Sequence, residues 1–158
     1  MKQIKLTINE ETHMVFCSPE ITLLTLLREV LHLTGTKEGC AAGECGVCTI
    51  IMNEKPVNSC MVMAMEADGA KIRTIEGEGK DGEISPLQRS FIEHHAFQCG
   101  FCTPGMIMSA RALLDKNPNP SREEIIEALE GNLCRCTGYE SIIEAVESLK
   151  ETGGTEHE

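Results

Sequence analysis

The sequence has very few of the large side chains that normally fill a protein core. Among its 158 residues it contains no tryptophan, one tyrosine and four phenylalanines. Small domains with few large side chains gain limited stability from burial alone, and many depend on cross-links or on bound metal. We therefore expect cross-links or metal to contribute to the stability of this chain.

Long apolar runs and an excess of positive charge are also missing. No run approaches the ~20 apolar residues that a membrane-spanning helix needs. The first residues show no apolar stretch followed by a small-residue cleavage site, so we expect no secretory signal and a cytoplasmic protein. The 25 acidic residues against 14 lysines and arginines give a net charge of −11, which disfavours nucleic acid and anionic membranes as partners. Other proteins are the expected partners.

Cysteine, in contrast, is abundant, with nine residues in the chain. Disulfides are rare in the cytosol, and an odd number of cysteines fits poorly with a closed disulfide framework. We therefore expect the thiols to be reduced or bound to metal. Eight of the nine fall into two groups of four, and the ninth, Cys17, is expected to be a buried thiol in a strand.

The first group of cysteines is typical of an iron–sulfur protein. Cys40, Cys45 and Cys48 lie in one short segment, and Cys60 follows after eleven residues, which is the spacing of plant-type 2Fe–2S clusters. A loop that supplies three ligands must curl around the cluster, and glycine allows such a curl because it accepts positive φ. The segment contains Gly39, Gly43 and Gly46. The alternative is a zinc site, although zinc sites usually combine two paired cysteine elements.

The second group consists of two short pairs, Cys99 with Cys102 and Cys134 with Cys136. Both pairs precede predicted helix starts, and the positive end of a helix dipole favours thiolates. The spacing favours an iron–sulfur cluster here and leaves zinc as the alternative.

Hydrophobic periodicity predicts an α+β fold. Alternating apolar residues predict strands over 4–8 and 12–17, joined in a hairpin, and a broad apolar face predicts a helix over 22–31. Two further short strands are predicted over 47–52 and 71–75, with a turn after the first of them. Strands packed around one helix make an α+β unit.

The predicted domain order follows from a change of pattern near the middle of the chain. Residues 1–76 form the α+β unit, and the glycine-rich, charged stretch 77–84 is predicted to be a linker. Capping patterns predict four short helices within residues 85–150, and a disordered tail is expected over 151–158. The four predicted helix starts are Ser85, Thr103, Ser121 and Thr137.

Three segments of the sequence resemble the molybdenum hydroxylase family, which includes xanthine dehydrogenases, aldehyde oxidoreductases, nicotinate dehydrogenase and carbon monoxide dehydrogenase. The segments are Gly39–Thr49, Gln98–Met106 and Gly131–Tyr139, and they occur in the family's order without departure. The resemblance spans about residues 2–150, a length that suits the separate small subunit of bacterial enzymes. It implies a β-grasp ferredoxin-like domain followed by a four-helix bundle.

The resemblance also implies cofactors and partners. It implies two 2Fe–2S clusters on this chain, a molybdenum-pterin cofactor on a large partner subunit and FAD on a medium partner subunit. The second group of cysteines would hold the cluster nearest the molybdenum, with Gln98 and Cys136 against the pterin, and the first group would face the FAD subunit. The path of electrons would run from molybdenum through the second cluster and then the first to FAD. The implied metal ligands are Cys40, Cys45, Cys48, Cys60, Cys99, Cys102, Cys134 and Cys136.

The implied function is that of the electron-transfer subunit of a molybdenum hydroxylase, with no group on this chain that touches substrate. The complete enzyme would hydroxylate a heterocycle or an aldehyde, and we lean towards a xanthine-type purine dehydrogenase. Alternatives within the family are nicotinate, aldehyde, carbon monoxide and aromatic-CoA enzymes. Alternatives outside it are a free-standing ferredoxin and a zinc-stabilised interaction module.

Overall fold

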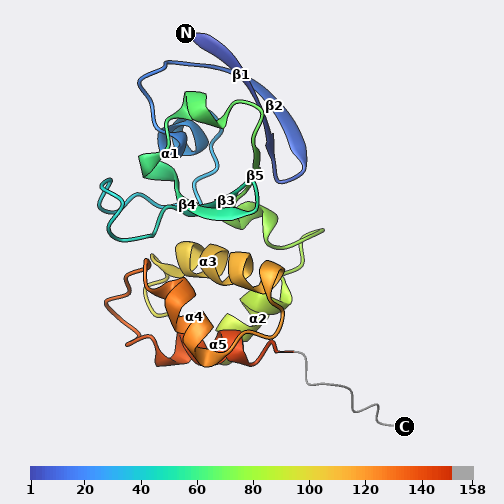
Figure 1. Ribbon diagram of the computed structural model, residues 1–158, viewed down its shortest axis with the longest axis vertical. Coiled ribbons are helices and arrows are strands. Elements are labelled where there is room, and N and C mark those ends of the chain that lie inside the picture. Colours follow the sequence, from blue (N-terminus) through green and yellow to red (C-terminus); the bar gives the residue numbers. More distant parts are fainter. Residues whose placement is uncertain (151–158) are drawn as a thin grey trace.

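The computed structural model describes residues 1–150, and the tail predicted over 151–158 lies outside the described residues. Within them, a half built around a sheet is followed by a helical half that packs against it (Figure 1). The sheet is mixed, with strand order β2-β1-β5-β3-β4, and only the β1–β5 pair is parallel. Its strands are β1 (Lys2–Ile8), β2 (Glu11–Cys17), β3 (Thr49–Met52), β4 (Lys55–Asn58) and β5 (Lys71–Arg73).

Two tight turns set the register of this sheet. Asn9 and Glu10 have φ values of 50° and 72°, and Asn53 and Glu54 have values of 48° and 68°. Successive residues with positive φ match the twist of the flanking strands, which is why such turns close hairpins. The first turn joins the predicted hairpin β1–β2. The second joins β3 to β4, an edge strand that the sequence patterns did not predict because Pro56 was assigned to the turn.

The predicted helix over 22–31 is helical, but it is not a regular α-helix. It begins as α1 (Leu23–Thr25) and continues as a π-helix over Leu26–Val30, where the amide of Leu31 donates to the carbonyl of Leu26 at 3.0 Å. Four leucines of this segment are fully buried, which explains why the amphipathic pattern was visible in the sequence. They are Leu23, Leu24, Leu26 and Leu27.

Four α-helices lie between residue 85 and the end of the described residues. They are α2 (Pro86–Glu93), α3 (Thr103–Lys116), α4 (Arg122–Leu129) and α5 (Glu140–Glu147). The capping boxes predicted at Ser85 and Ser121 are both present. The cap of α5 differs from the prediction, because Tyr139, with a φ of 71°, holds the N-cap position in place of Thr137. Sheet and helices together make an α+β fold.

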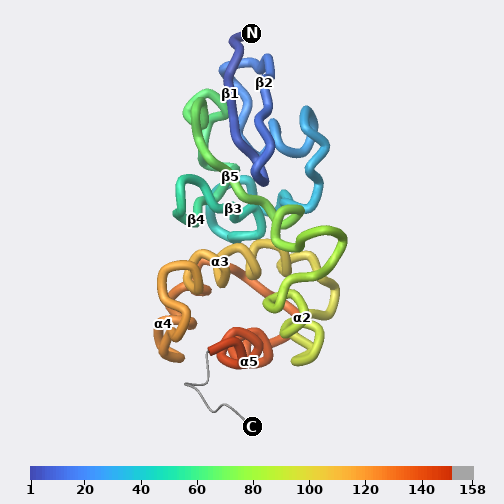
Figure 2. The backbone as a smooth tube through the Cα atoms, turned by 90° about the vertical axis from the view of Figure 1, so that its right-hand side faces the viewer, coloured from blue at the N-terminus to red at the C-terminus, as the bar shows by residue number. Residues whose placement is uncertain are grey.

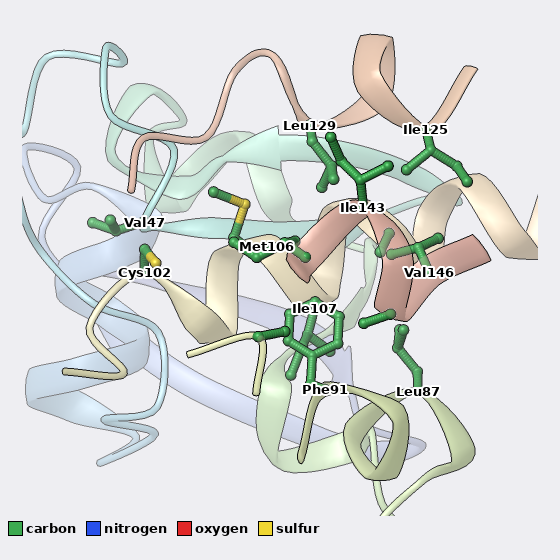
Figure 3. Packing of buried hydrophobic residues seen from close by; sticks show 14 residues of the cluster. Val47, Leu87, Phe91, Cys102, Met106, Ile107, Ile125, Leu129, Ile143 and Val146 are labelled. Carbon is green, nitrogen blue, oxygen red and sulfur yellow. The ribbon is translucent and has the colours of Figure 1, made fainter. Parts of the chain in front are cut away.

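Helix α3 joins the two halves. Both views place it between the sheet and the other helices (Figures 1 and 2), and Met108 and Ala112 on one face pack against Ile51 of β3. Its other face, with Met106 and Ile107, lies in the helical core (Figure 3). Helix α3 therefore packs against β3 on one side and belongs to the helical core on the other.

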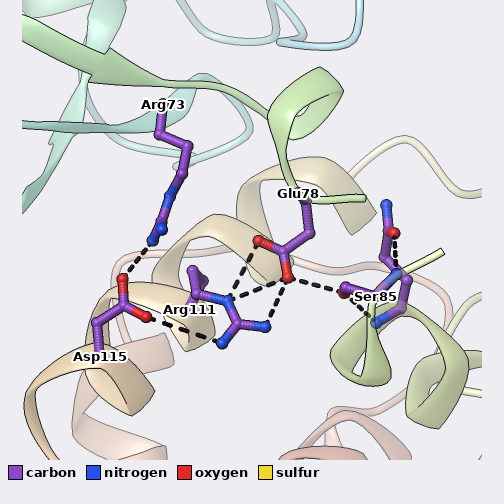
Figure 4. A network of polar contacts seen from close by, with 6 residues as sticks. Arg73, Glu78, Ser85, Arg111 and Asp115 are labelled. Atoms are coloured by element: carbon purple, nitrogen blue, oxygen red, sulfur yellow. Dashed lines mark hydrogen bonds and ion pairs between the residues drawn. The ribbon is translucent and has the colours of Figure 1, made fainter. Parts of the chain in front are cut away.

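The stretch predicted to be a linker is fixed to α3. The carboxylate of Glu78 is only 2% exposed and receives hydrogen bonds from the guanidinium of Arg111, the shortest at 2.7 Å, and one from the hydroxyl of Ser85 at 2.8 Å (Figure 4). A second ion pair joins Arg73 of β5 to Asp115 of α3. Glu78 therefore ties this segment to α3, and the pair of Arg73 with Asp115 connects the sheet directly to the same helix.

No helix in residues 1–150 is long and apolar enough to cross a membrane.

Candidate iron–sulfur centres

The first group of cysteines lies on a loop whose amides point at sulfur. Cys40 Sγ accepts hydrogen bonds from the amides of Ala42 and Glu44, both at 3.3 Å, and Cys45 Sγ accepts one from the amide of Cys40 at 3.4 Å. The bond from Ala42, followed by bonds from Cys45 and Glu44, lowers the pKa of Cys40 to about 7. Gly43 permits the curl with a φ of 75°. This loop is arranged to stabilise thiolates.

Cys48 and Cys60 are the buried members of the same group. Cys48 is at the end of the loop, and Ser59 ties the segment of Cys60 to it by donating from its hydroxyl to the carbonyl of Cys48 at 2.8 Å. Burial raises the pKa of Cys48 to about 11, and the neighbouring thiol of Cys60 adds to the increase. Leu24 of α1 packs against both cysteines and excludes water from them. The thiol of Cys48 would therefore become a thiolate near neutral pH only with a cation beside it.

The second group lies between the helices. Cys99 Sγ and Cys136 Sγ are 3.7 Å apart. Burial, with a smaller contribution from Cys134, raises the pKa of Cys102 to about 12. Burial alone would raise the pKa of Cys134 as well, but the hydroxyl and the amide of Thr137 donate to its sulfur and lower the pKa overall. Each sulfur of this group therefore has at least one other cysteine of the group beside it.

The eight thiols thus meet in four pairs, two in each group. The pairs are Cys40 with Cys45, Cys48 with Cys60, Cys99 with Cys136 and Cys102 with Cys134. In the part of the chain that the structure describes, no three His, Cys, Asp or Glu side chains converge on one ion. A 2Fe–2S cluster takes four cysteine thiolates, two on each tetrahedral iron. The donor set of each group fits such a cluster.

Gln98 and Cys136, which the resemblance places against a pterin, lie together. The side-chain amide of Gln98 donates to the carbonyl of Cys136 at 3.0 Å, and both residues are exposed. Their contact with a pterin stays a prediction.

One buried residue of the site was not predicted as functional. Asn132 is 4% exposed and donates to the carbonyl of Gly46 in the first cysteine loop at 2.9 Å. The signal available in the sequence was a polar residue, Asn132, two positions before the candidate ligand Cys134. The partner of Asn132, Gly46, is 86 positions away in the sequence. Sequence patterns do not give such distant partners.

Comparisons with known proteins agree with this geometry. The family described as 2Fe-2S iron-sulfur cluster binding domain matches residues 6–74, and the 2Fe-2S binding domain family matches residues 74–147. The nicotinate dehydrogenase small FeS subunit of Eubacterium barkeri is 54% identical over 143 residues, 90% of this chain and 91% of that protein. A probable xanthine dehydrogenase subunit of Bacillus subtilis (strain 168) is 47% identical over 142 residues, 90% of this chain and 82% of that one.

Solved structures show the same fold. A chain of quinoline 2-oxidoreductase from Pseudomonas putida 86 has a TM-score of 0.90 and 49% identity, over 92% of this chain and 90% of that chain. The aldehyde oxidoreductase from Desulfovibrio gigas has a TM-score of 0.91 and 42% identity over 95% of this chain, but over only 17% of its own. In the latter protein the matching region is part of a much longer chain.

Fold and site together define a protein with two 2Fe–2S binding domains, one built on a mixed sheet and one on helices. The chain belongs to the small iron–sulfur subunits of the molybdenum hydroxylase family. The resemblance of the three cysteine segments is confirmed. The chain is an electron-transfer component of an oxidoreductase, and relatives in this family are subunits of larger complexes.

Proposed function

We propose that this chain carries electrons from a molybdenum-pterin site on a large partner subunit to FAD on a medium partner subunit. The observation that carries the proposal is the convergence of eight thiols in four pairs, in two groups whose loops are in contact within one fold. A bound 2Fe–2S cluster supplies a one-electron acceptor and donor at each group.

We assign the ligands by group. Cys40, Cys45, Cys48 and Cys60 would hold the first cluster, and Cys99, Cys102, Cys134 and Cys136 the second. The chain's own contribution is to orient these thiols and to stabilise their negative charge. The amides of Ala42 and Glu44 and the hydroxyl of Thr137 already donate to sulfur, and such bonds tune the potential of a cluster.

The position that we assign to the large subunit is supported by exposed apolar side chains next to cysteines of the second group. Phe97, Phe101 and Leu133 are 41%, 47% and 54% exposed. Apolar side chains gathered on a surface mark a protein interface more often than an open face. We place the large subunit here, beside Gln98 and Cys136. Met61, which is 62% exposed next to the first loop, marks the side that we assign to the FAD subunit.

The substrate of the complete enzyme is proposed to be a nitrogen heterocycle. Relatives are named for nicotinate, nicotine and xanthine, and the structural relative for quinoline. The purine substrate expected from the sequence is one member of this set. The free-standing ferredoxin and the zinc module are not favoured, because both cluster-binding families match in order along the chain.

The finer descriptions of the fold are part of the same proposal. We propose a β-grasp ferredoxin-like domain over residues 1–76, a connecting segment over 77–84 and a four-helix bundle over 85–150, in a cytoplasmic protein. Separate cores behind the two cysteine groups support the division, although Val47 of the first loop packs in the helical core.

Metal analysis tests the proposed function. The anaerobically purified complex is expected to contain about four irons and about four acid-labile sulfides per copy of this chain, because each cluster has two of each. On reduction, two distinct rhombic spin-½ signals are expected at low temperature. Molybdenum, pterin and FAD should co-purify on other chains. Zinc in place of iron, or a single cluster signal, would contradict the proposal.

A further inference from the structure

The two cysteine loops touch through their backbones. The amide of Leu133 donates to the carbonyl of Cys45 at 2.9 Å. Cys45 belongs to the first group, and Leu133 is bonded directly to Cys134 of the second. The sulfurs of Cys45 and Cys134 are therefore connected by a path that consists of covalent bonds and this one hydrogen bond.

Asn132 holds the loops in this position. Its side-chain nitrogen donates to the carbonyl of Gly46 at 2.9 Å, and its side-chain oxygen accepts from the hydroxyl of Ser109 on α3 at 2.7 Å. Its own amide donates to the carbonyl of Leu129 at 2.9 Å. Asn132 is adjacent to Leu133 in the chain, and its side chain binds Gly46, which is adjacent to Cys45. It therefore holds both the donor and the acceptor of the hydrogen bond between Leu133 and Cys45.

Glycines allow the backbones to come this close. A Cβ atom on Gly46 would lie 2.2 Å from the carbonyl oxygen of Gly131, and one on Gly105 would lie 2.4 Å from the carbonyl oxygen of Gly46. Gly46 also has a φ of 70°, which side chains disfavour. The contact is therefore made by main chain against main chain, with the amide of Asn132 as the polar side chain that spans it.

We propose that Asn132 is a positioning residue for electron transfer between the two groups of cysteines, acting by holding the carbonyl of Cys45 against the amide of Leu133. This inference rests on the proposed function, since it requires a cluster at each group. Cys99, Cys102, Cys134 and Cys136 would hold a cluster that gives up one electron, and Cys40, Cys45, Cys48 and Cys60 would hold the cluster that accepts it, so one would be oxidised as the other is reduced. No bond forms or breaks, and no proton is required.

A purely structural role for Asn132 predicts a different result from a role in positioning the hydrogen bond between Leu133 and Cys45. If Asn132 only contributed to packing, its removal would lower stability and leave electron movement between intact clusters unchanged. If it positions that hydrogen bond, its removal leaves both clusters in place but lets the carbonyl of Cys45 and the amide of Leu133 separate. The rate of electron equilibration between the clusters distinguishes the two roles.

The chain offers a closely matched control in Asn58. Its side-chain nitrogen donates to the carbonyl of Gly43 in the first loop at 3.1 Å, and its oxygen lies 3.3 Å from the hydroxyl of Thr49. Asn58 therefore binds the same loop through a side-chain amide, as Asn132 does, but both of its partners belong to the first half of the molecule. Asn58→Ala removes its bonds with Gly43 and Thr49 and leaves in place the hydrogen bonds from Leu133 to Cys45 and from Asn132 to Gly46.

Asn132→Ala and Asn58→Ala are compared in the purified complex. A laser flash reduces the complex photochemically, and rapid freeze-quench resonance spectra then follow the electron at each cluster. We expect several-fold slower equilibration between the clusters in Asn132→Ala and an unchanged rate in Asn58→Ala, at equal iron content. Ser109→Ala, which frees the amide of Asn132 without deleting it, should slow the step less.

Three outcomes are decisive. An Asn132→Ala complex with full iron content and the unaltered rate would overturn the inference and leave the proposed function standing. If Asn132→Ala does not assemble, Ser109→Ala decides the question, and an unaltered rate in that variant overturns the inference. A parent complex without iron would overturn the proposed function itself.

Discussion

Replacing Arg111 with leucine is expected to lower the free energy of unfolding by about 3 kcal/mol, because the change leaves the carboxylate of Glu78 buried without its cation. Glu78 is 2% exposed, and Arg111 supplies most of its hydrogen bonds. Burial by itself would lower the pKa of Arg111, but the hydrogen bonds and charge of Glu78 outweigh it and raise the pKa. Anaerobic urea unfolding of the complex, followed by circular dichroism, measures the loss.

Arg122→Leu is the control for this prediction. Arg122 also pairs with two carboxylates, but these belong to Glu140 and Glu147, which are 64% and 27% exposed. Surface pairs of this kind contribute less than about 1 kcal/mol. Adding Glu78→Gln to Arg111→Leu removes the buried charge and keeps an oxygen for Ser85, so part of the loss should return. An equal cost for both arginine variants, or no recovery in the double variant, would contradict the explanation.

Local chemistry explains what could be predicted from the sequence. The cap at Ser85 and the cap at Ser121 each depend on residues three positions apart, so they are visible in the chain itself. The first cysteine loop is equally local, because three of its cysteines and its glycines lie within ten residues. The spacing of the cysteines along the chain was therefore sufficient to predict the cluster sites.

Contacts between distant residues explain what could not be predicted. The stretch 77–84 looked structureless because its glycines and charges have no periodicity, yet Glu78 has its partner Arg111 33 positions further on. Two further hydrogen bonds depend on the packing of α3 between the halves. They are the bond from the amide of Leu133 to the carbonyl of Cys45 and the bond from the side chain of Asn132 to the carbonyl of Gly46. The π-helix after α1 also escaped prediction, because an apolar stripe does not reveal the hydrogen-bond pattern beneath it.

Removing one buried cysteine from each group is expected to remove one cluster at a time. Cys48→Ala should lower the iron content from about four to about two per chain and abolish one resonance signal, and Cys102→Ala should do the same for the other signal, because a 2Fe–2S cluster needs all four thiolates. In either variant, electron flow from substrate to FAD should cease while molybdenum stays bound. Iron analysis and low-temperature resonance spectra of the purified complexes measure both effects.

Cys17→Ala separates ligation from packing in this experiment. Cys17 is 2% exposed, as Cys48 is, and Cys102 is 8% exposed, so all three substitutions delete the same sulfur from a buried position. The sulfur of Cys17 contacts Met65 at 3.8 Å and lies in the core of the first half, outside both cysteine groups. Its loss should leave about four irons and both signals in place. Loss of iron from Cys17→Ala would show that packing controls the iron content, and full iron in Cys48→Ala would contradict the assignment of Cys48 as a ligand.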